Sequence, residues 1–176
     1  MKKIFFLIIL TVGVLLGACT NDDTHSDPGQ DPHSPLQYGT IGSLDSEKGV
    51  VIAIGTKGSE KIKIDDVSVN NDKQPKTVKM QVSDPRKGFI ITDTFDKKIK
   101  SKYGVKNVKE VTLQPHTSPQ KQLERSNKDH SNENIVSYGL SVVHDKPIHK
   151  VMIDYRYSEE SFEKTIQIKE MPIREK

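Results

Sequence analysis

The chain has 176 residues, 33% of them apolar and none of them tryptophan, which is enough for one core of ordinary domain size. Its 27 Lys and Arg residues nearly balance 24 Asp and Glu residues, so it lacks the strongly basic character typical of nucleic-acid-binding domains. A single cysteine excludes an internal disulfide and a thiolate cluster for a metal.

The chain begins with the layout of an export signal. Lys2 and Lys3 precede an apolar run from Ile4 to Leu16, as in secretory signal peptides. The run is shorter than the roughly 20 apolar residues that a bilayer-spanning helix needs. It ends in Leu16-Gly17-Ala18-Cys19, a sequence that resembles the lipobox of bacterial lipoproteins.

This resemblance implies a covalent membrane anchor. In that family the sulfur of the cysteine, here Cys19, receives diacylglycerol, and a peptidase then cuts between Ala18 and Cys19. Two acyl chains anchor a protein stably, whereas one gives only marginal binding. We therefore expect a lipid-anchored protein on the extracytoplasmic face of the cell membrane. An ordinary secretory signal that contains a cysteine, or an N-terminal membrane helix, is the alternative.

Cleavage would divide the chain into three parts: a signal peptide over residues 1–18, a lipidated cysteine with a disordered tether over 19–40, and one β-rich domain over 41–172. From Thr20 to Pro35 no aliphatic or aromatic residue occurs, so this stretch cannot bury enough surface to fold. The mature chain would hold 25 basic and 24 acidic residues, which predicts no nucleic-acid partner.

Regular structure is expected from Gly49 onward. Val50 to Ile54 is a short apolar run typical of a buried strand. Lys61 to Asn70 alternates in two phases, which predicts a strand with a bulge near Asp65-Asp66. Further strands are predicted over residues 78–82 and 108–113.

One stretch breaks this rhythm. Phe95, Ile99 and Tyr103 are spaced by four residues, which predicts one short helix around Thr94–Tyr103, capped by Asp93 or Thr94 at its start and ended by Gly104. Residues 115–133 are then polar and predict a long mobile loop, with a helical turn after Ser118-Pro119.

The last third carries the strongest β pattern. Apolar residues alternate over residues 136–142, 151–157 and 162–168, with turns between them, which predicts a three-stranded antiparallel meander. Seven or eight strands in all indicate a mainly β fold, an antiparallel β-sandwich whose strand count also fits an immunoglobulin-like arrangement.

Two surface clusters are candidate binding sites. Exposed lysines at the predicted helix could hold the domain against an anionic membrane or wall polymer; they are Lys97, Lys98, Lys100 and Lys102. The alternative is a solvated helix face. His144 and His149 flank a predicted turn and could bind zinc or copper if they face each other, or they could be exposed turn residues.

The sequence contains no recognisable catalytic motif, so we expect neither an enzyme nor a bound cofactor. The leading hypothesis is a non-enzymatic interaction module that binds an envelope protein or a cell-wall component. A lipoprotein that binds a small solute or a metal is the alternative.

Overall fold

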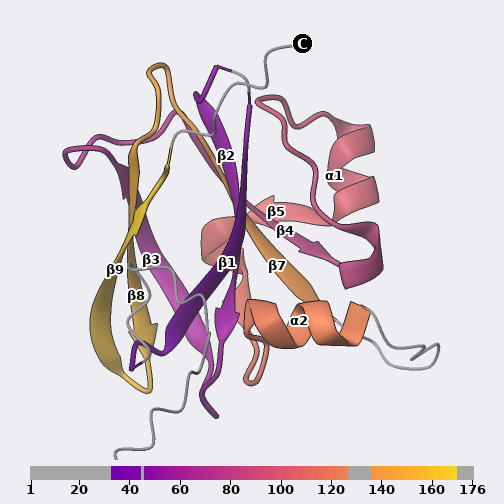
Figure 1. Cartoon of the computed structure of the whole chain (residues 1–176), viewed down its shortest axis with the longest axis vertical. Helices are drawn as coiled ribbons and strands as arrows, with labels where there is room; N and C mark the ends of the chain where they lie inside the picture. The colour runs from indigo at the N-terminus through magenta and orange to yellow at the C-terminus, as the bar shows by residue number, and fades with distance from the viewer. Residues whose placement is uncertain (1–32, 45, 127–135, 170–176) are drawn as a thin grey trace, which may run out of the picture.

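A computed structural model describes residues 33–44, 46–126 and 136–169, and nine strands in these residues form two antiparallel sheets (Figure 1). Sheet A has the strand order β1 (Leu36–Ser43), β2 (Gly49–Thr56), β7 (Ser137–Val143), β4 (Thr77–Ser83) and β5 (Val105–Asn107). Sheet B has the order β6 (Thr112–Leu113), β3 (Ile62–Val69), β8 (Lys150–Tyr157) and β9 (Glu160–Gln167).

This order is that of a constant-type immunoglobulin sandwich, in which strands A, B, E and D form one sheet and C, F and G the other. Strands β1, β2, β7 and β4 correspond to A, B, E and D, and strands β3, β8 and β9 correspond to C, F and G. The short strands β5 and β6 extend one edge of each sheet. The predicted antiparallel β-sandwich is therefore confirmed.

The core lies between the sheets, because alternate residues of each strand point inward. Ile52 and Leu140 from sheet A and Ile153 from sheet B are fully buried in one cluster. One inward position of the edge strand β9 is charged: Lys164 is buried, with its ammonium nitrogen 5.8 Å from the ring centre of Tyr38 in β1.

Two strands contain register shifts, at which the alternation of side chains between the two faces of the sheet is interrupted. The β3–β8 register shifts between Ile64 and Asp66, which confirms the predicted bulge. The β1–β2 register shifts between Tyr38 and Ile41. The prediction that regular structure begins at Gly49 is wrong, since β1 starts at Leu36, inside the expected tether. Its apolar residues change phase at the shift, so no alternation marks the strand.

The predicted three-stranded meander is also wrong. Strand β7 lies between β2 and β4 in sheet A, whereas β8 and β9 pair with each other in sheet B. The connection from β7 to β8 therefore crosses from one sheet to the other. Alternation shows that one face of a strand is buried. Each sheet of a sandwich has a buried face, so alternation does not tell which sheet a strand belongs to.

Helix α1 (Lys97–Tyr103) is shorter than predicted. Asp96, and neither Asp93 nor Thr94, caps it: the Asp96 carboxylate accepts a hydrogen bond of 2.7 Å from the Ile99 backbone N–H. Gly104 ends the helix in the left-handed conformation, as expected.

Two other segments differ from the predicted pattern. Residues 108–113 do not form one strand, because Val108–Glu110 is a 3-10 turn (η2) followed by the two-residue strand β6. In the predicted loop over residues 115–133, the expected helical turn is a helix of eight residues, α2 (Pro119–Ser126). Residues 127–133 of that loop lie outside the described ranges.

A candidate binding groove on the outer face of sheet A

A cavity of about 570 Å³ lies on the face of sheet A that points away from the core. Strands β1 and β2 form its floor, and Ser137 of β7 borders it. One wall is α2, and the other is the segment 85–91, which begins with the 3-10 turn η1 (Pro85–Lys87). A volume of this size lies within the usual range for small-molecule sites.

Glycines of sheet A let the walls approach its outer face closely. A Cβ atom built at Gly39 would lie 2.6 Å from Cβ of Pro119, the first residue of α2. A Cβ atom built at Gly139 would lie 2.6 Å from Cδ1 of Phe89 in the other wall. Each wall therefore contacts sheet A at a glycine.

The side chain of Gln81 in β4 fixes the wall formed by residues 85–91. Its amide nitrogen donates to the backbone oxygen of Ile90 at 2.7 Å, and its amide oxygen accepts from the backbone N–H of Ile90 at 2.9 Å. The same nitrogen donates to the hydroxyl of Ser141 at 2.8 Å. Gln81 is fully buried, so these hydrogen bonds are shielded from water. The hydrogen bonds between Gln81 and Ile90 hold the neighbouring residues Phe89 and Ile91 in place.

The start of this wall is held by a charged pair. The carboxylate of Asp84 accepts the backbone N–H of Arg86 at 2.9 Å, which caps η1, and it also accepts the Arg86 side-chain Nε–H at 2.9 Å. These hydrogen bonds to Arg86 lower the pKa of Asp84 to about 2. Asp84 is therefore a carboxylate under all ordinary conditions.

Helix α2 is fixed by a second buried glutamine. The Gln122 amide nitrogen donates to the backbone oxygen of Ile54 in β2 at 3.0 Å and also to that of Thr117. Ser118 precedes the helix, and its backbone oxygen accepts the N–H of Gln122 at 2.9 Å. Because Gln122 faces the sheet, Leu123 beside it projects from the body of the domain.

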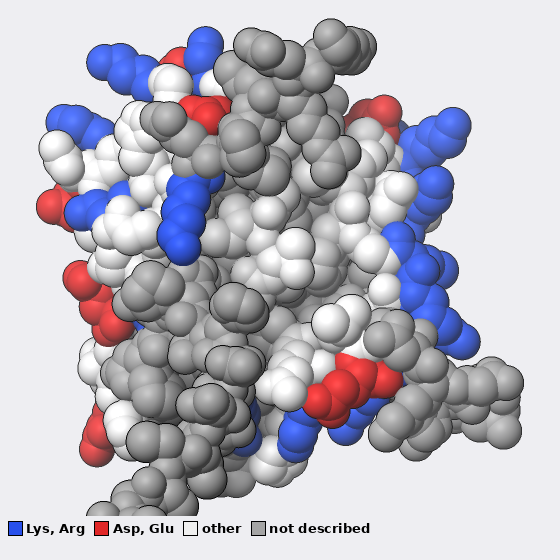
Figure 2. Space-filling model, viewed as in Figure 1, with Lys and Arg blue, Asp and Glu red and all other residues white. Residues whose placement is uncertain are grey.

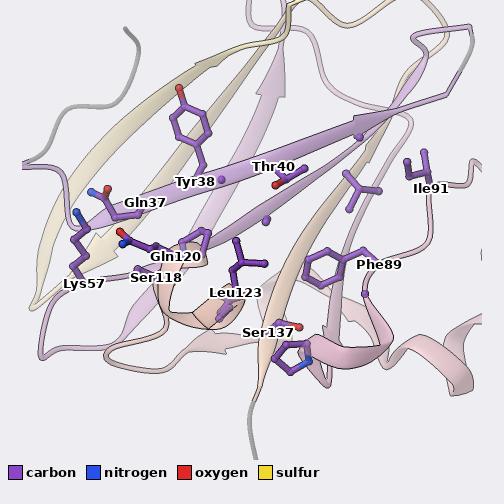
Figure 3. A pocket seen from close by; sticks show the side chains of 18 residues that line it. Gln37, Tyr38, Thr40, Lys57, Phe89, Ile91, Ser118, Gln120, Leu123 and Ser137 are labelled. Carbon is purple, nitrogen blue, oxygen red and sulfur yellow. The ribbon is translucent and has the colours of Figure 1, made fainter. Parts of the chain in front are cut away.

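Large apolar side chains are exposed at this groove. Among the described residues, the exposed large hydrophobic side chains are Ile91, 41% exposed, and Leu123, 63% exposed, and both line the cavity. The side chains of Leu123 and Phe89 extend over the strands, and Ile91 lies farther along the groove (Figure 3). Apolar surface gathered in one hollow is characteristic of binding sites, whereas isolated exposed residues carry little meaning.

The groove is polar at one end. The side chains of Lys57, Gln37 and Gln120 lie together there, opposite the end that carries Ile91 (Figure 3). Lys57 follows the last residue of β2 and is exposed. It carries the one formal charge among the 18 lining residues, which include no Asp or Glu.

The predicted lysine cluster is a separate surface. Lys97, Lys98, Lys100 and Lys102 are all exposed on α1, and none of them lines the groove. Lys and Arg side chains gather along the edge of the molecule that carries α1, beside a mostly uncharged area (Figure 2). The Lys102 ammonium nitrogen lies 5.2 Å from the ring centre of Tyr103. The cluster is therefore a solvent-facing positive surface.

The two predicted metal-binding histidines lie in the connection between β7 and β8. His149 is exposed and His144 is half-buried, and the backbone N–H groups of both donate to oxygens, of Asn70 and Lys48 respectively. Within the described ranges no group of three or more His, Cys, Asp or Glu side chains is placed to hold a metal ion. The pair thus lacks a third protein ligand from that part of the chain.

The predicted lipidation and cleavage sites, Cys19 and Ala18, lie outside the described residues. Inside them, no helix is both long enough and apolar enough to cross a membrane.

Sequence reasoning did not find the groove, although it left two signals. Gly39 and Gly139 occupy outward positions of strands, and glycine inside a strand often marks the close approach of another segment. Leu123 is the one aliphatic residue in the polar stretch over residues 115–133. Neither signal shows that α2 and residues 85–91 meet the same face of one sheet.

Comparison with known proteins finds no matching protein family, no similar curated protein and no similar solved structure.

Proposed function

We propose that the chain is a membrane-anchored lipoprotein of the cell envelope whose immunoglobulin-like domain is a non-enzymatic binding module, with the groove on sheet A as its binding site. The observation that carries this proposal is the position of Ile91 and Leu123, the exposed large hydrophobic side chains of the described residues, which both line one hollow. The signal-like N-terminus and Cys19 support the membrane location.

The chemistry of the groove favours binding over catalysis. Its lining combines apolar side chains with amides, hydroxyls and one ammonium group. It contains no histidine, carboxylate or thiol, the groups that most often act as general bases or nucleophiles. The buried polar side chains Gln122 and Ser137 instead donate hydrogen bonds to backbone oxygens of the fold.

Copurification of molecules with the lipidated full-length protein, extracted from its native membranes, tests this proposal. The informative variant is Leu123→Asp, which places a charge on the exposed wall, and Glu124→Gln on the same helix is the matched control. A molecule retained by the unchanged protein and by the control, but lost from Leu123→Asp, is the expected result. Equal retention by all three proteins would exclude the groove as its site.

The lysines of α1 favour a second role, in which the domain rests on an anionic surface. All four side chains are exposed on one short helix, where they can act together on a polyanion. The chain from residue 19 with Cys19→Ala, added to cells from outside, should bind them in low salt and be released as salt rises, because salt screens exposed charges. Reversing Lys97, Lys98 and Lys100 to Glu should abolish that retention.

The matched control reverses three exposed lysines elsewhere in the domain: Lys48, Lys61 and Lys73. It changes the net charge by the same amount. If both triple variants are lost from the cells equally, total charge and not the α1 surface governs retention.

A further inference from the structure

We infer that the groove takes an amphiphile with one anionic head and one apolar chain, such as a fatty acid, with its head at Lys57 and its chain against the apolar walls. This inference rests on the proposed function, since it names the ligand class of the same groove. It follows from the shape, the charge and the hydrogen-bonding state of the lining.

The groove extends over several residues of the edge strand β1. Its floor follows β1 from Gln37, which pairs with Gly55, to Gly42, which pairs with Val51. Because of the register shift in β1, this stretch pairs with only four residue steps of β2, from Gly55 to Val51, or about 13 Å, roughly the extended length of a ten-carbon chain. Within this stretch Pro119 lies against Gly39 and Ile91 lies against Gly42, and the side chains of Leu123 and Phe89 extend over the strands between the two ends (Figure 3).

The charge of the groove is positive and lies at one end. Lys57 stands where β2 ends, close to the amide groups of Gln37 and Gln120, and no carboxylate of the lining offsets it. Ala53 and Ile91, farther along the groove, bring no charge. A ligand complementary to this pattern has its negative group at one end and hydrocarbon along the rest.

The hydrogen-bonding state of the middle argues against an extended peptide. The backbone of β2 is paired on one side with β1 and on the other with β7. The amide of Gln122 and the hydroxyl of Ser137 already donate to backbone oxygens. A peptide backbone pressed onto this floor would leave polar groups without partners, which costs free energy, whereas a hydrocarbon chain has none to satisfy.

The test uses two amphiphiles of equal chain length and opposite charge, dodecanoate and dodecyltrimethylammonium, each competing with a dansyl-labelled fatty acid. The protein is the chain from residue 19 with Cys19→Ala, which contains every described residue. We expect dodecanoate to bind about threefold more tightly than the cation, the size of an exposed ion pair. Lys57→Glu should reverse that order, and Lys121→Glu, an exposed lysine outside the lining, should leave it unchanged.

Thermal unfolding of Lys57→Glu at an unchanged temperature would show that the reversal is not a loss of fold. The same order of affinities in Lys57→Glu as in the unchanged protein would overturn the assignment of the head to Lys57. Failure of both amphiphiles to displace the probe would overturn the ligand class. The binding-module proposal would survive either failure if the copurifying molecule were still lost from Leu123→Asp.

Discussion

The side-chain amide of Gln81 forms hydrogen bonds with both backbone polar groups of Ile90, nine residues farther along the chain. This pairing imitates the bonding of a neighbouring strand, although residues 88–91 form no strand. It holds an irregular segment against the outer face of sheet A, and Phe89 and Ile91 form a groove wall because of it.

Replacing Gln81 should destabilise the domain and open the groove. Gln81→Met keeps the volume but removes three hydrogen bonds, at a cost of about 3 kcal/mol in the free energy of unfolding. Denaturant titration measures this loss. Amide hydrogen exchange should show faster exchange at Ile90 than in β2, and protection equal to that of the unchanged protein would mean that other contacts hold the wall.

The variant Gln81→Glu gives a pH-dependent version of the same experiment. Its carboxylate can accept from the Ile90 N–H but cannot donate to the Ile90 oxygen, while the protonated acid can do both. Burial should raise the pKa of the introduced acid above its unfolded value, so the folded state binds the extra proton. The loss of stability relative to the unchanged protein should therefore be smaller at low pH. It should grow as pH rises through the pKa of the introduced acid in the folded state.

Enlarging Gly139 should push Phe89 off the sheet. The methyl group of Gly139→Ala would meet the aromatic ring, and such overpacking costs about 1–3 kcal/mol of stability. In the background Phe89→Ala the same change should cost much less, because the clash is gone. A double-mutant cycle measured by denaturant unfolding checks this, and additive effects would contradict the contact.

The Asp84–Arg86 pair should contribute to stability in a defined pH window. The pKa of Asp84 is lowered to about 2 in the folded chain from an ordinary value of 3.8. Because the folded value is the lower one, the contribution is complete above about pH 4 and is lost as pH falls toward about pH 2. Arg86→Ala should raise the pKa of Asp84 toward 3.8, which NMR of the carboxyl carbon can follow. An unchanged pKa would mean that the Arg86 side chain does not lower it.

The proposed lipidation of Cys19 predicts a clear biochemical result. Cys19→Ala should abolish incorporation of radiolabelled palmitate, leave residues 1–18 attached and remove the diacylglycerol anchor. Thr20→Ala, beside the cleavage point, should change neither labelling nor processing. Palmitate labelling of the Cys19→Ala protein would contradict the lipobox interpretation.

The sequence predicted strands well where alternation was unbroken and failed where the fold interrupts it. The bulge at Asp65 was visible because both halves of β3 alternate clearly around it. Strand β1 was missed because the register shift after Tyr38 places its next apolar residue, Ile41, three positions away, and because two of its other residues are glycines. The distribution of strands between two sheets left no trace in the alternation.

The groove lay beyond sequence reasoning for a different reason. Its walls come from segments that precede and follow α1 and β5 in the chain, and only the folded sheet brings them to one face. Gln81 and Gln122 read as ordinary polar residues, yet both are buried and hold those walls. Partners that pair across the fold cannot be read from a local pattern.

The buried Lys164 bears on how copies of this protein behave when they are crowded. Strand β9 is an eight-residue edge strand, and such an edge can recruit a strand from another molecule and start aggregation. A charged residue directed inward from an edge strand is one of the features by which natural sheets oppose such pairing. Molecules concentrated on a surface, where encounters between neighbours are frequent, would thereby stay separate and keep their grooves accessible.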